Sequence, residues 1–208
     1  MDPLKFAGVP VPQRMGDVIA DAGELLLSRG KAATWRHVQG VEEACADLAQ
    51  RFGLEEAPCR MAGILHDISA VIPPAQMLQY ARETGMALDP AEEKYPFLLH
   101  QRLSAVVAQT CFGIEDESVL RAIACHTTLW AGASDLDMVL FLADKIAWDQ
   151  SGEPPFLAAL NAGLAVSLRE GCRAYIDYVM NNGMILQPHQ DLLAARAWLS
   201  GEIQECDE

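Results

Sequence analysis

The amino-acid sequence predicts an all-α protein, and three observations lead to that prediction. Apolar residues recur with helical spacing along most of the 208 residues. Glycines and prolines separate these stretches where one helix would end and the next begin. No two segments show the alternation of apolar and polar residues that is typical of paired strands. We therefore expect a helical bundle, and the 51% of hydrophobic residues is enough to bury a substantial core.

Four helices are expected in the first half of the chain, after a helical extension formed by residues 1–30. They span residues 34–52, 57–68, 75–84 and about 96–112. Each is followed by a residue that disfavours further helix: Gly53, Pro73, Gly85 and Gly113. In the first of these helices, the apolar spacing places His37 on the buried face.

Four more helices are expected in the second half. They begin at about residues 117, 135, 156 and 188, and the last two are long, reaching residues 181 and 203. Ser134 and Asp137 match a capping box, in which two side chains accept hydrogen bonds from free backbone N–H groups at a helix start. We expect the last two helices to pack on the preceding ones, so that residues 31–208 form one domain.

The composition argues against several classes of function. The net charge of −14 disfavours a nucleic-acid-binding face, because phosphate backbones require basic surfaces. No apolar run approaches the roughly 18 to 20 residues of a membrane span, and the first residues lack the features of a signal peptide. We therefore expect a cytoplasmic protein with no membrane partner. Because the six cysteines form no Cys-x-x-Cys pair, we expect free thiols, with Cys45, Cys111 and Cys125 filling apolar surroundings.

Histidines and aspartates on apolar helices are the strongest functional signal. Four of the five histidines belong to one series, which consists of His37, His66-Asp67, His100, His126 and Asp144. Imidazoles and carboxylates from separate helices make a site for a divalent metal. A single histidine on an apolar face is more often a hydrogen-bonded core residue, but Asp144 follows three apolar residues, where an unpaired carboxylate is rare. One metal site explains the set better than separate structural roles do. His189, at a polar helix start, is expected to be surface-exposed.

The series is embedded in five short motifs. They are His37-Val38-Gln39-Gly40-Val41, Ala62-Gly63-Ile64-Leu65-His66-Asp67, Leu98-Leu99-His100, His126-Thr127-Thr128 and Phe141-Leu142-Ala143-Asp144. Together they resemble the HD-domain metal-dependent phosphohydrolases, and most closely the YqeK-type symmetrical diadenosine tetraphosphate hydrolases. The resemblance covers roughly residues 30–200.

The resemblance implies an all-α bundle with a divalent metal, most often iron and alternatively manganese or another divalent ion, bound by His37, His66, Asp67 and Asp144. His100 and His126 would face the same cavity, where they either bind a second ion or contact substrate phosphate. Asp67 and these two histidines would be catalytic. Thr127 and Thr128 would bind the phosphate groups of the substrate.

The implied function is metal-dependent hydrolysis of a nucleotide or dinucleoside polyphosphate, with diadenosine tetraphosphate cleaved to ADP as the most specific expectation. The implied partner is a small phosphorylated nucleotide, and the similar proteins often form homodimers. Two alternatives remain open. One is a phosphatase of another small phosphorylated metabolite, and the other is a degenerate HD domain that binds a nucleotide as a non-catalytic regulator.

Some positions depart from the family's pattern: Thr34 replaces an Arg, Ala70 a Lys, Gln150 an Arg and Leu129 a Gly. Each lost cation removes a charge-assisted hydrogen bond of roughly 1.5 to 3 kcal/mol. Arg36, Arg102 and Lys145 are nearby candidates to replace them. Because Arg36 and Lys145 are adjacent to ligand candidates on their helices, we expect both to point away from the cavity.

Overall fold

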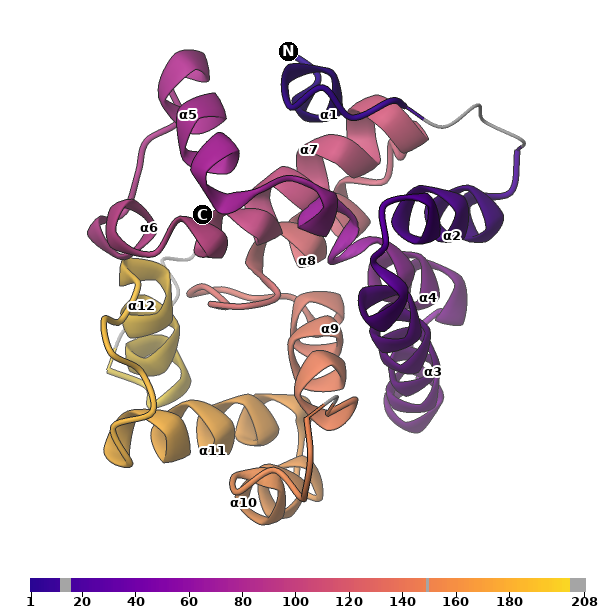
Figure 1. Ribbon diagram of the computed structural model, residues 1–208. Helices are drawn as coiled ribbons and strands as arrows, with labels where there is room; N and C mark the ends of the chain where they lie inside the picture. The colour runs from indigo at the N-terminus through magenta and orange to yellow at the C-terminus, as the bar shows by residue number, and fades with distance from the viewer. Residues whose placement is uncertain (12–15, 149, 203–208) are drawn as a thin grey trace.

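A computed structural model describes residues 1–11, 16–148 and 150–202, and every regular element among them is a helix (Figure 1). The elements in order are α1 (Pro3–Phe6), α2 (Val18–Ser28), α3 (Ala32–Phe52), α4 (Glu56–Leu65), the 3₁₀ helix η1 (Ile68–Val71), α5 (Pro74–Thr84), α6 (Pro90–Lys94), the 3₁₀ helix η2 (Pro96–Leu99), α7 (His100–Phe112), α8 (Glu117–Cys125), α9 (Asp135–Ile146), α10 (Leu157–Leu164), α11 (Leu168–Asn181) and α12 (Gln190–Leu199). The prediction of an all-α fold is therefore confirmed.

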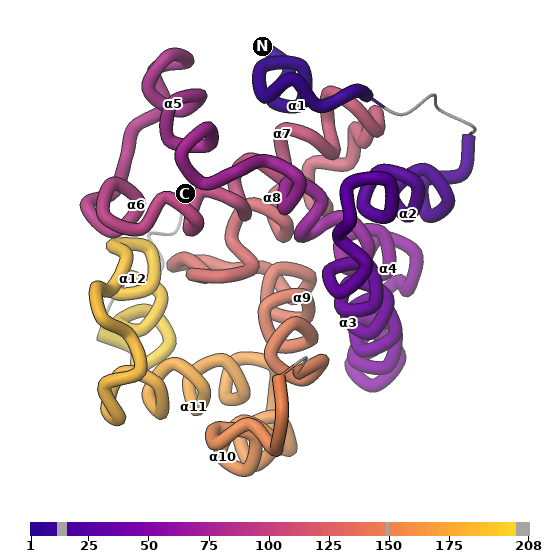
Figure 2. Tube along the Cα trace, in the orientation of Figure 1, coloured from indigo at the N-terminus to yellow at the C-terminus, as the bar shows by residue number. Residues whose placement is uncertain are grey.

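The core lies where α3, α4, α8 and α9 pack on one another, with α7 packed on α8. Helix α9 lies between the α3–α4 pair and α11, as Figures 1 and 2 show. It is surrounded by other helices, and Val139 to Ala143 are fully buried. Burial of a large apolar side chain such as Phe141 stabilises the fold by about 1.5 to 3 kcal/mol. The element that carries Asp144 is therefore held firmly in place.

The capping box predicted at the start of α9 is present. The Ser134 hydroxyl accepts a hydrogen bond from the Asp137 backbone N–H at 3.2 Å, and an Asp137 carboxylate oxygen accepts one from the Ser134 N–H at 2.9 Å. The Asp137 carboxylate also accepts a hydrogen bond from the Trp130 indole. These contacts fix the residue at which the helix starts, and hence the register of Asp144 two and a half turns later.

The two helices within the first thirty residues, α1 and α2, pack directly on the rest of the bundle. Helix α1 packs on α5 and α7, and α2 packs on α3, α4 and η1. Leu4, Leu25 and Leu26 are almost completely buried there. The division into an extension at residues 1–30 and a domain at residues 31–208 therefore stays a prediction. The contacts show only that α1 and α2 contribute to the common core.

The predicted long helix over residues 156–181 is wrong, because the chain forms two helices there, α10 and α11. The Ser167 side chain caps α11 by accepting a hydrogen bond from the Glu170 N–H at 3.1 Å. At Gly163 a β-carbon would lie 2.3 Å from the Glu170 carbonyl oxygen, so only glycine permits this close approach of the two helices. The last helix, α12, is shorter than expected, and the predicted end at residue 203 lies outside the described residues.

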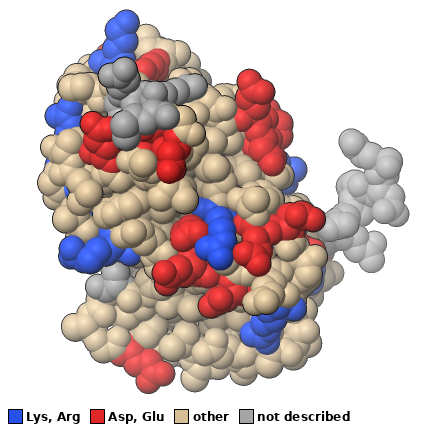
Figure 3. All heavy atoms as spheres, turned by 90° about the vertical axis from the view of Figure 1, so that its right-hand side faces the viewer, with Lys and Arg blue, Asp and Glu red and all other residues tan. Residues whose placement is uncertain are grey.

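Two surface properties bear on function. None of the helices in the described part of the chain is long and apolar enough to cross a membrane. On the face drawn in Figure 3, acidic side chains lie in clusters with single basic groups between them, and no continuous basic stripe is seen. Four of the cysteines predicted as free thiols, Cys45, Cys59, Cys125 and Cys172, are unpaired and buried. Cys111 is also buried, and its thiol donates a hydrogen bond to Asp2 Oδ1 at 3.3 Å, while Cys206 lies outside the described residues.

Candidate metal centre

His66 and Asp67 lie just beyond the end of α4, where the chain leaves the helix. Helix α4 ends at Leu65, three residues earlier than predicted, and Asp67 has a φ of −110° that is not helical. The His66 Nδ1–H donates to the Gly63 carbonyl at 2.7 Å. Helix α4 can approach α3 closely because Gly63 has no side chain, since a β-carbon there would lie 2.8 Å from Glu42 Cα. This close packing brings the His-Asp pair to the helix that carries the first histidine.

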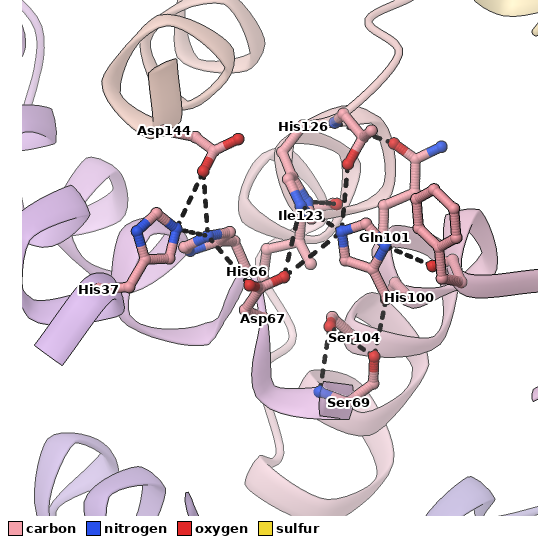
Figure 4. A network of polar contacts seen from close by, with 12 residues as sticks. His37, His66, Asp67, Ser69, His100, Gln101, Ser104, Ile123, His126 and Asp144 are labelled. Atoms are coloured by element: carbon pink, nitrogen blue, oxygen red, sulfur yellow. Dashed lines mark hydrogen bonds and ion pairs between the residues drawn. The ribbon is translucent and has the colours of Figure 1, made fainter. Parts of the chain in front are cut away.

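His37 from α3 and Asp144 from α9 complete one side of the centre, as Figure 4 shows. His37 Nε2 lies 3.0 Å from Asp144 Oδ1 and 3.3 Å from His66 Nε2. His66 Nε2 lies 3.7 Å from the same Asp144 oxygen and 3.9 Å from Asp67 Oδ2. Three separate parts of the chain thus aim donor atoms at one point.

His100 and His126 form the other side of the centre and share Asp67 with the first (Figure 4). Their Nε2 atoms lie 3.0 Å apart, and they lie 3.4 Å and 3.7 Å from Asp67 Oδ1. Ligand atoms of Asp67, His37 and His66 lie close enough to one another to hold an ion, and so do those of Asp67, His100 and His126. Asp67 is therefore common to two potential ligand sets.

Hydrogen bonds fix the tautomer of three of these histidines. The Nδ1–H groups of His66, His100 and His126 donate to the carbonyl oxygens three residues earlier, which belong to Gly63, Phe97 and Ile123. Each Nε2 then presents a lone pair to the centre. The Nε2 atoms of His100 and His126 lie 3.0 Å apart. In neutral imidazoles their lone pairs repel each other unless a cation or a proton lies between them. The donor set therefore fits a divalent metal, which nitrogen and carboxylate oxygen ligands bind well.

The pKa values of the two aspartates favour the charged, metal-binding form. Burial opposes ionisation of Asp67, but the adjacent His66 and His100 outweigh it and lower the pKa of that carboxyl. Burial also raises the pKa of Asp144, but Lys145 and then His37 outweigh this effect and hold the pKa well below its usual range. Both side chains are thus carboxylates at neutral pH.

His126 is held neutral. Burial and then the neighbouring His66 and His100 lower its pKa well below the usual range for imidazole. Its side chain is almost completely enclosed. A buried neutral imidazole is suited to bind a metal and poorly suited to donate a proton to a leaving group at neutral pH.

Lys145 does not point away from the centre, and the prediction that it does so is wrong. Its Nζ donates to Asp144 Oδ2 at 2.6 Å and to the His126 carbonyl oxygen at 3.0 Å. It also lies 4.7 Å from the centroid of the Phe141 ring and 5.9 Å from that of Tyr175. The position of Lys145 depends on tertiary structure, because Leu136 to Ala143 on the same helix are buried against other elements and Lys145 itself keeps only 9% exposure.

The two arginines considered as replacements lie elsewhere. Arg36 is exposed and lines a separate cavity, which His37 shares but Asp67 and Asp144 do not. The expectation that it points away from the centre stays a prediction. The Arg102 Nη1 lies 2.9 Å from a carboxylate oxygen of buried Glu92 and 2.8 Å from a backbone carbonyl oxygen. Neither side chain replaces a cation at the centre.

Gln101 is a residue of this site that the sequence pattern did not single out. Its side-chain oxygen accepts hydrogen bonds from the backbone N–H groups of Thr127 and Thr128 at 3.0 Å and 3.3 Å. The Thr128 hydroxyl bonds to the same side chain, whereas the Thr127 hydroxyl lies 3.1 Å from His100 Nε2. The sequence feature that could have identified Gln101 is a polar residue on the buried face of a helix, directly after the candidate ligand His100.

Leu129 continues this turn in the left-handed region of backbone conformation, with a φ of 56°. Such a φ is costly for a residue with a side chain. Its side chain is fully buried, and its N–H donates to the Cys125 carbonyl oxygen at 2.7 Å. Packing therefore holds a leucine in a conformation that glycine would adopt freely.

His189 is buried, so the prediction that it is surface-exposed is wrong. It caps α12, with its Nδ1 accepting a hydrogen bond from the Asp191 N–H at 3.1 Å. Its Nε2 lies 3.8 Å from a carboxylate oxygen of Glu92. The next N–H, of Gln190, donates to the Asp89 carboxylate at 3.1 Å. The His189 imidazole and the Gln190 N–H thus connect the start of α12 to α6 and its N-cap residue Asp89.

Cavities reach the centre from two directions. One of about 530 Å³ is lined by Asp67, His100 and Ala70, among others. Another of about 300 Å³ is lined by Asp67, Asp144, Lys145 and Gln150, among others. A third, also of about 300 Å³, is mainly apolar and includes Thr127, Thr128, Phe97, Tyr175 and His189. The centre is therefore open to a ligand larger than a single phosphate group.

Comparison with known proteins places these residues in a family. Residues 34–149 match the HD domain family. A protein of Lactococcus lactis subsp. cremoris, described as an uncharacterized protein in the pepC 5'region, is 39% identical over 143 residues, which are 69% of this chain and 73% of the relative. The symmetrical bis(5'-nucleosyl)-tetraphosphatase of Bacillus subtilis is 32% identical over 110 residues, which are 53% of this chain and 59% of that relative.

One solved structure supports the same placement. It is described as a predicted HD superfamily hydrolase involved in NAD metabolism from Clostridium acetobutylicum, and it is 24% identical. It superimposes with a TM-score of 0.75 over 89% of this chain and 96% of that one. At this identity the likeness shows the fold. The match over residues 34–149 shows that the chain belongs to the HD domain family.

Proposed function

We propose that the protein is a metal-dependent phosphohydrolase that cleaves a dinucleoside polyphosphate, with diadenosine tetraphosphate hydrolysed to two ADP as the specific reaction. The observation that carries the proposal is the position of the Asp67 carboxylate. One of its oxygens faces His66, and the other faces His100 and His126. The names of the Bacillus relative and of similar tetraphosphatases from Halalkalibacterium halodurans and Staphylococcus aureus supply the substrate class.

The metal would be held by the residues proposed from the sequence. His37, His66, Asp67 and Asp144 would form the first set, and Asp67 with His100 and His126 the second. We propose two ions, with iron as the expected metal and manganese or another divalent ion as the alternative. When bound, a divalent metal lowers the pKa of water toward 7 and so supplies hydroxide at neutral pH.

The chain's own residues divide the remaining work. Asp67, held charged by its histidine neighbours, positions both halves of the site. His126 serves as a neutral ligand because it is buried. His100 retains a side-chain exposure of 20% and borders the 530 Å³ cavity, so it contacts both the centre and an incoming phosphate. The Thr127 hydroxyl, beside His100, is placed to donate a hydrogen bond to a phosphate oxygen when it turns from the imidazole.

The alternative of a nucleotide-binding regulator rests on one feature of the site. Ala70 and Gln150 line the two cavities at Asp67 and carry no charge there. A polyphosphate would be bound more weakly without cations at these places. The complete ligand set nevertheless favours hydrolysis, since a purely binding domain has no need of two ligand sets that share a carboxylate.

One experiment separates the proposed activities. The purified protein is analysed for bound metal and then given diadenosine tetraphosphate, with products resolved by chromatography. Two ADP are expected, whereas ATP and AMP would indicate cleavage at a different bond and contradict symmetrical hydrolysis. A panel of nucleotides and sugar phosphates is tested in parallel, and turnover confined to one of those would favour the phosphatase. Binding without turnover in metal-loaded protein would favour the regulator.

Asp67→Asn is the matched control for this assay. The amide keeps the size of the side chain but loses the charge and one acceptor oxygen. We expect it to lose both metal and turnover. Retention of full activity in this variant would contradict the role of Asp67.

Three broader expectations stay part of the proposal. We propose that residues 31–208 act as the catalytic domain and residues 1–30 as a helical extension packed on it. We propose that the protein acts in the cytoplasm on a small phosphorylated nucleotide. A homodimer is the proposed assembly, which light scattering on the purified protein would test.

A further inference from the structure

The 530 Å³ cavity beside Asp67 and His100 has one charged end and a long apolar wall. Its remaining lining residues are Lys31, Ala70, Val71, Ile72, Pro73, Pro74, Met77 and Phe97. An apolar wall that ends in a polar centre suits a nucleoside with its phosphates directed toward the metal ligands. Such a ligand brings several negative charges into a cavity that already contains Asp67.

Among the described residues that line this cavity, Lys31 is the one lysine or arginine. Its side chain is half-buried, and its ammonium group forms no ion pair or hydrogen bond with the residues that the structure describes. In contrast, Lys145 is committed to Asp144 and Arg102 to Glu92. The Lys31 charge is therefore available to a ligand.

The backbone around Lys31 is fixed by the junction of α2 and α3. Gly30 has a φ of 71°, and its N–H donates to the Leu27 carbonyl oxygen at 3.0 Å. The Lys31 N–H donates to the Leu26 carbonyl oxygen at 2.9 Å, and its own carbonyl oxygen accepts from the Trp35 N–H at 2.9 Å. This is the arrangement that commonly ends one helix and starts another. The lysine thus extends from a rigid corner rather than from a loose loop.

We propose that Lys31 binds phosphate oxygens of the nucleotide in this cavity and supplies the positive charge that Ala70 lacks. The inference rests on the proposed function, because it takes the nucleotide as the ligand of the cavity. It makes Lys31 a specificity-determining residue for polyphosphates. Its contribution depends on a positive charge within the cavity, whichever lining position carries that charge.

The test compares four variants with the wild-type protein. Lys31→Gln removes the charge, Lys31→Arg keeps it, and Lys31→Gln with Ala70→Lys moves it to another lining position of the same cavity. Arg29→Gln is the matched control, because it removes the same charge from an exposed residue two positions away. Binding of ADP is measured by calorimetry, with metal content determined in each sample. The KM and kcat for diadenosine tetraphosphate are measured in parallel.

We expect Lys31→Gln to weaken ADP binding about ten-fold and to raise the KM by a similar factor, with kcat unchanged. Lys31→Arg and the double variant should recover most of the lost affinity, and Arg29→Gln should stay within two-fold of wild type. Equal affinities for Lys31→Gln and Arg29→Gln would overturn the inference, as would a wild-type protein that does not bind ADP. If ADP binds but diadenosine tetraphosphate is not cleaved, the proposed reaction fails while the comparison of Lys31 variants still decides this inference.

Discussion

The Lys145 ammonium group lies 2.6 Å from the carboxylate of Asp144, its neighbour on α9, and both groups face the candidate metal centre. The lysine adds a positive charge to a site that otherwise contains the negative carboxylates of Asp67 and Asp144. Burial opposes its charge, but Asp144 outweighs that effect and raises the pKa of Lys145. The pair therefore stabilises the charged form of a ligand before any metal binds.

Lys145→Met should destabilise the metal-free protein by about 2 to 3 kcal/mol, because it leaves the Asp144 carboxylate without its cation. The pKa of Asp144 is lowered in the folded protein, so its stabilising effect is present above the pKa of the unfolded chain and is lost as the pH falls through the folded value. The variant should therefore lose more stability at pH 7 than at pH 3. Urea unfolding at both pH values measures this difference, with exposed Arg36→Met as the control. Equal losses at the two pH values would show that the pair contributes packing alone.

Gly63→Ala should destabilise the protein by about 1 to 3 kcal/mol, because the new β-carbon would lie 2.8 Å from Glu42 Cα. The displacement should also lower metal content, since the Gly63 carbonyl oxygen orients His66. Gly40→Ala on the facing helix is the matched control. A β-carbon there meets only Ala147 Cβ at 3.7 Å, so this variant should gain about 0.5 to 1 kcal/mol from higher helix propensity. Thermal unfolding and elemental analysis measure both effects, and a destabilised Gly40→Ala would contradict the reasoning.

Gln101→Ala should lower kcat about ten-fold, because two backbone N–H groups of the Thr127–Thr128 turn lose their common acceptor. Metal content should fall little, since neither Gln101 nor the turn belongs to the ligand sets. Gln109→Ala, an exposed glutamine on the same helix, provides the comparison. Hydrolysis assays with metal analysis of both variants check this expectation. Unchanged kcat in Gln101→Ala would show that the turn has no part in substrate contact.

His126→Ala should reduce bound metal from two ions to one per chain and abolish turnover. The remaining set of His37, His66 and Asp67 is complete without it. His37→Ala should also leave one ion per chain, because it removes a ligand of the other ion, the one held with His66 and Asp67. Elemental analysis with an activity assay tests both variants. If His126→Ala retained its metal and its turnover, the assignment of this histidine to the centre would be wrong.

The contact between His189 and Glu92 should make stability depend on pH. Burial lowers the pKa of His189, but the Glu92 carboxylate and then Asp89 outweigh it and raise the value above that of free imidazole. A raised pKa means that the stabilisation is present below the unfolded pKa and is lost as the pH rises through the folded value. His189→Gln should therefore cost about 1 kcal/mol more at pH 5.5 than at pH 8.5.

Urea unfolding of wild type and His189→Gln at these two pH values measures the difference. Arg102 also pairs with Glu92 and keeps that carboxylate charged in both conditions. His189 lies apart from the metal ligands, so the experiment can be carried out on metal-free protein. A cost independent of pH would show that the imidazole acts only as the cap of α12.

The series of histidines and aspartates was recognisable from the sequence because each member stands out in its own local setting. Periodicity placed His37 on a buried helix face, and the apolar run before Asp144 made an unpaired carboxylate improbable there. The capping box of Ser134 and Asp137 was readable for the same reason, since its contacts span only three residues. The prediction of the HD domain family is confirmed by the match over residues 34–149.

The errors concern residues whose position depends on distant partners. Lys145 was expected to point away because neighbours on a helix usually diverge, but it is largely buried by the elements around α9 and bonds to Asp144 and to the His126 carbonyl oxygen. His189 was expected at the surface because its neighbours are polar, yet its imidazole lies beside Glu92 and the adjacent backbone N–H of Gln190 donates to Asp89. The break between α10 and α11 depends on the close approach at Gly163, which local helix propensity does not reveal.

The sequence by itself determined the helical class, the family and the identity of the metal-ligand candidates, because these follow from local spacing and from residue chemistry. Only the tertiary structure decided how Asp67 lies between two potential ligand sets, which cations reach the cavities and how Gln101 supports the threonine turn. These features depend on distances between residues far apart in the chain. Such distances are set by how closely the helices pack, and no local pattern specifies that packing.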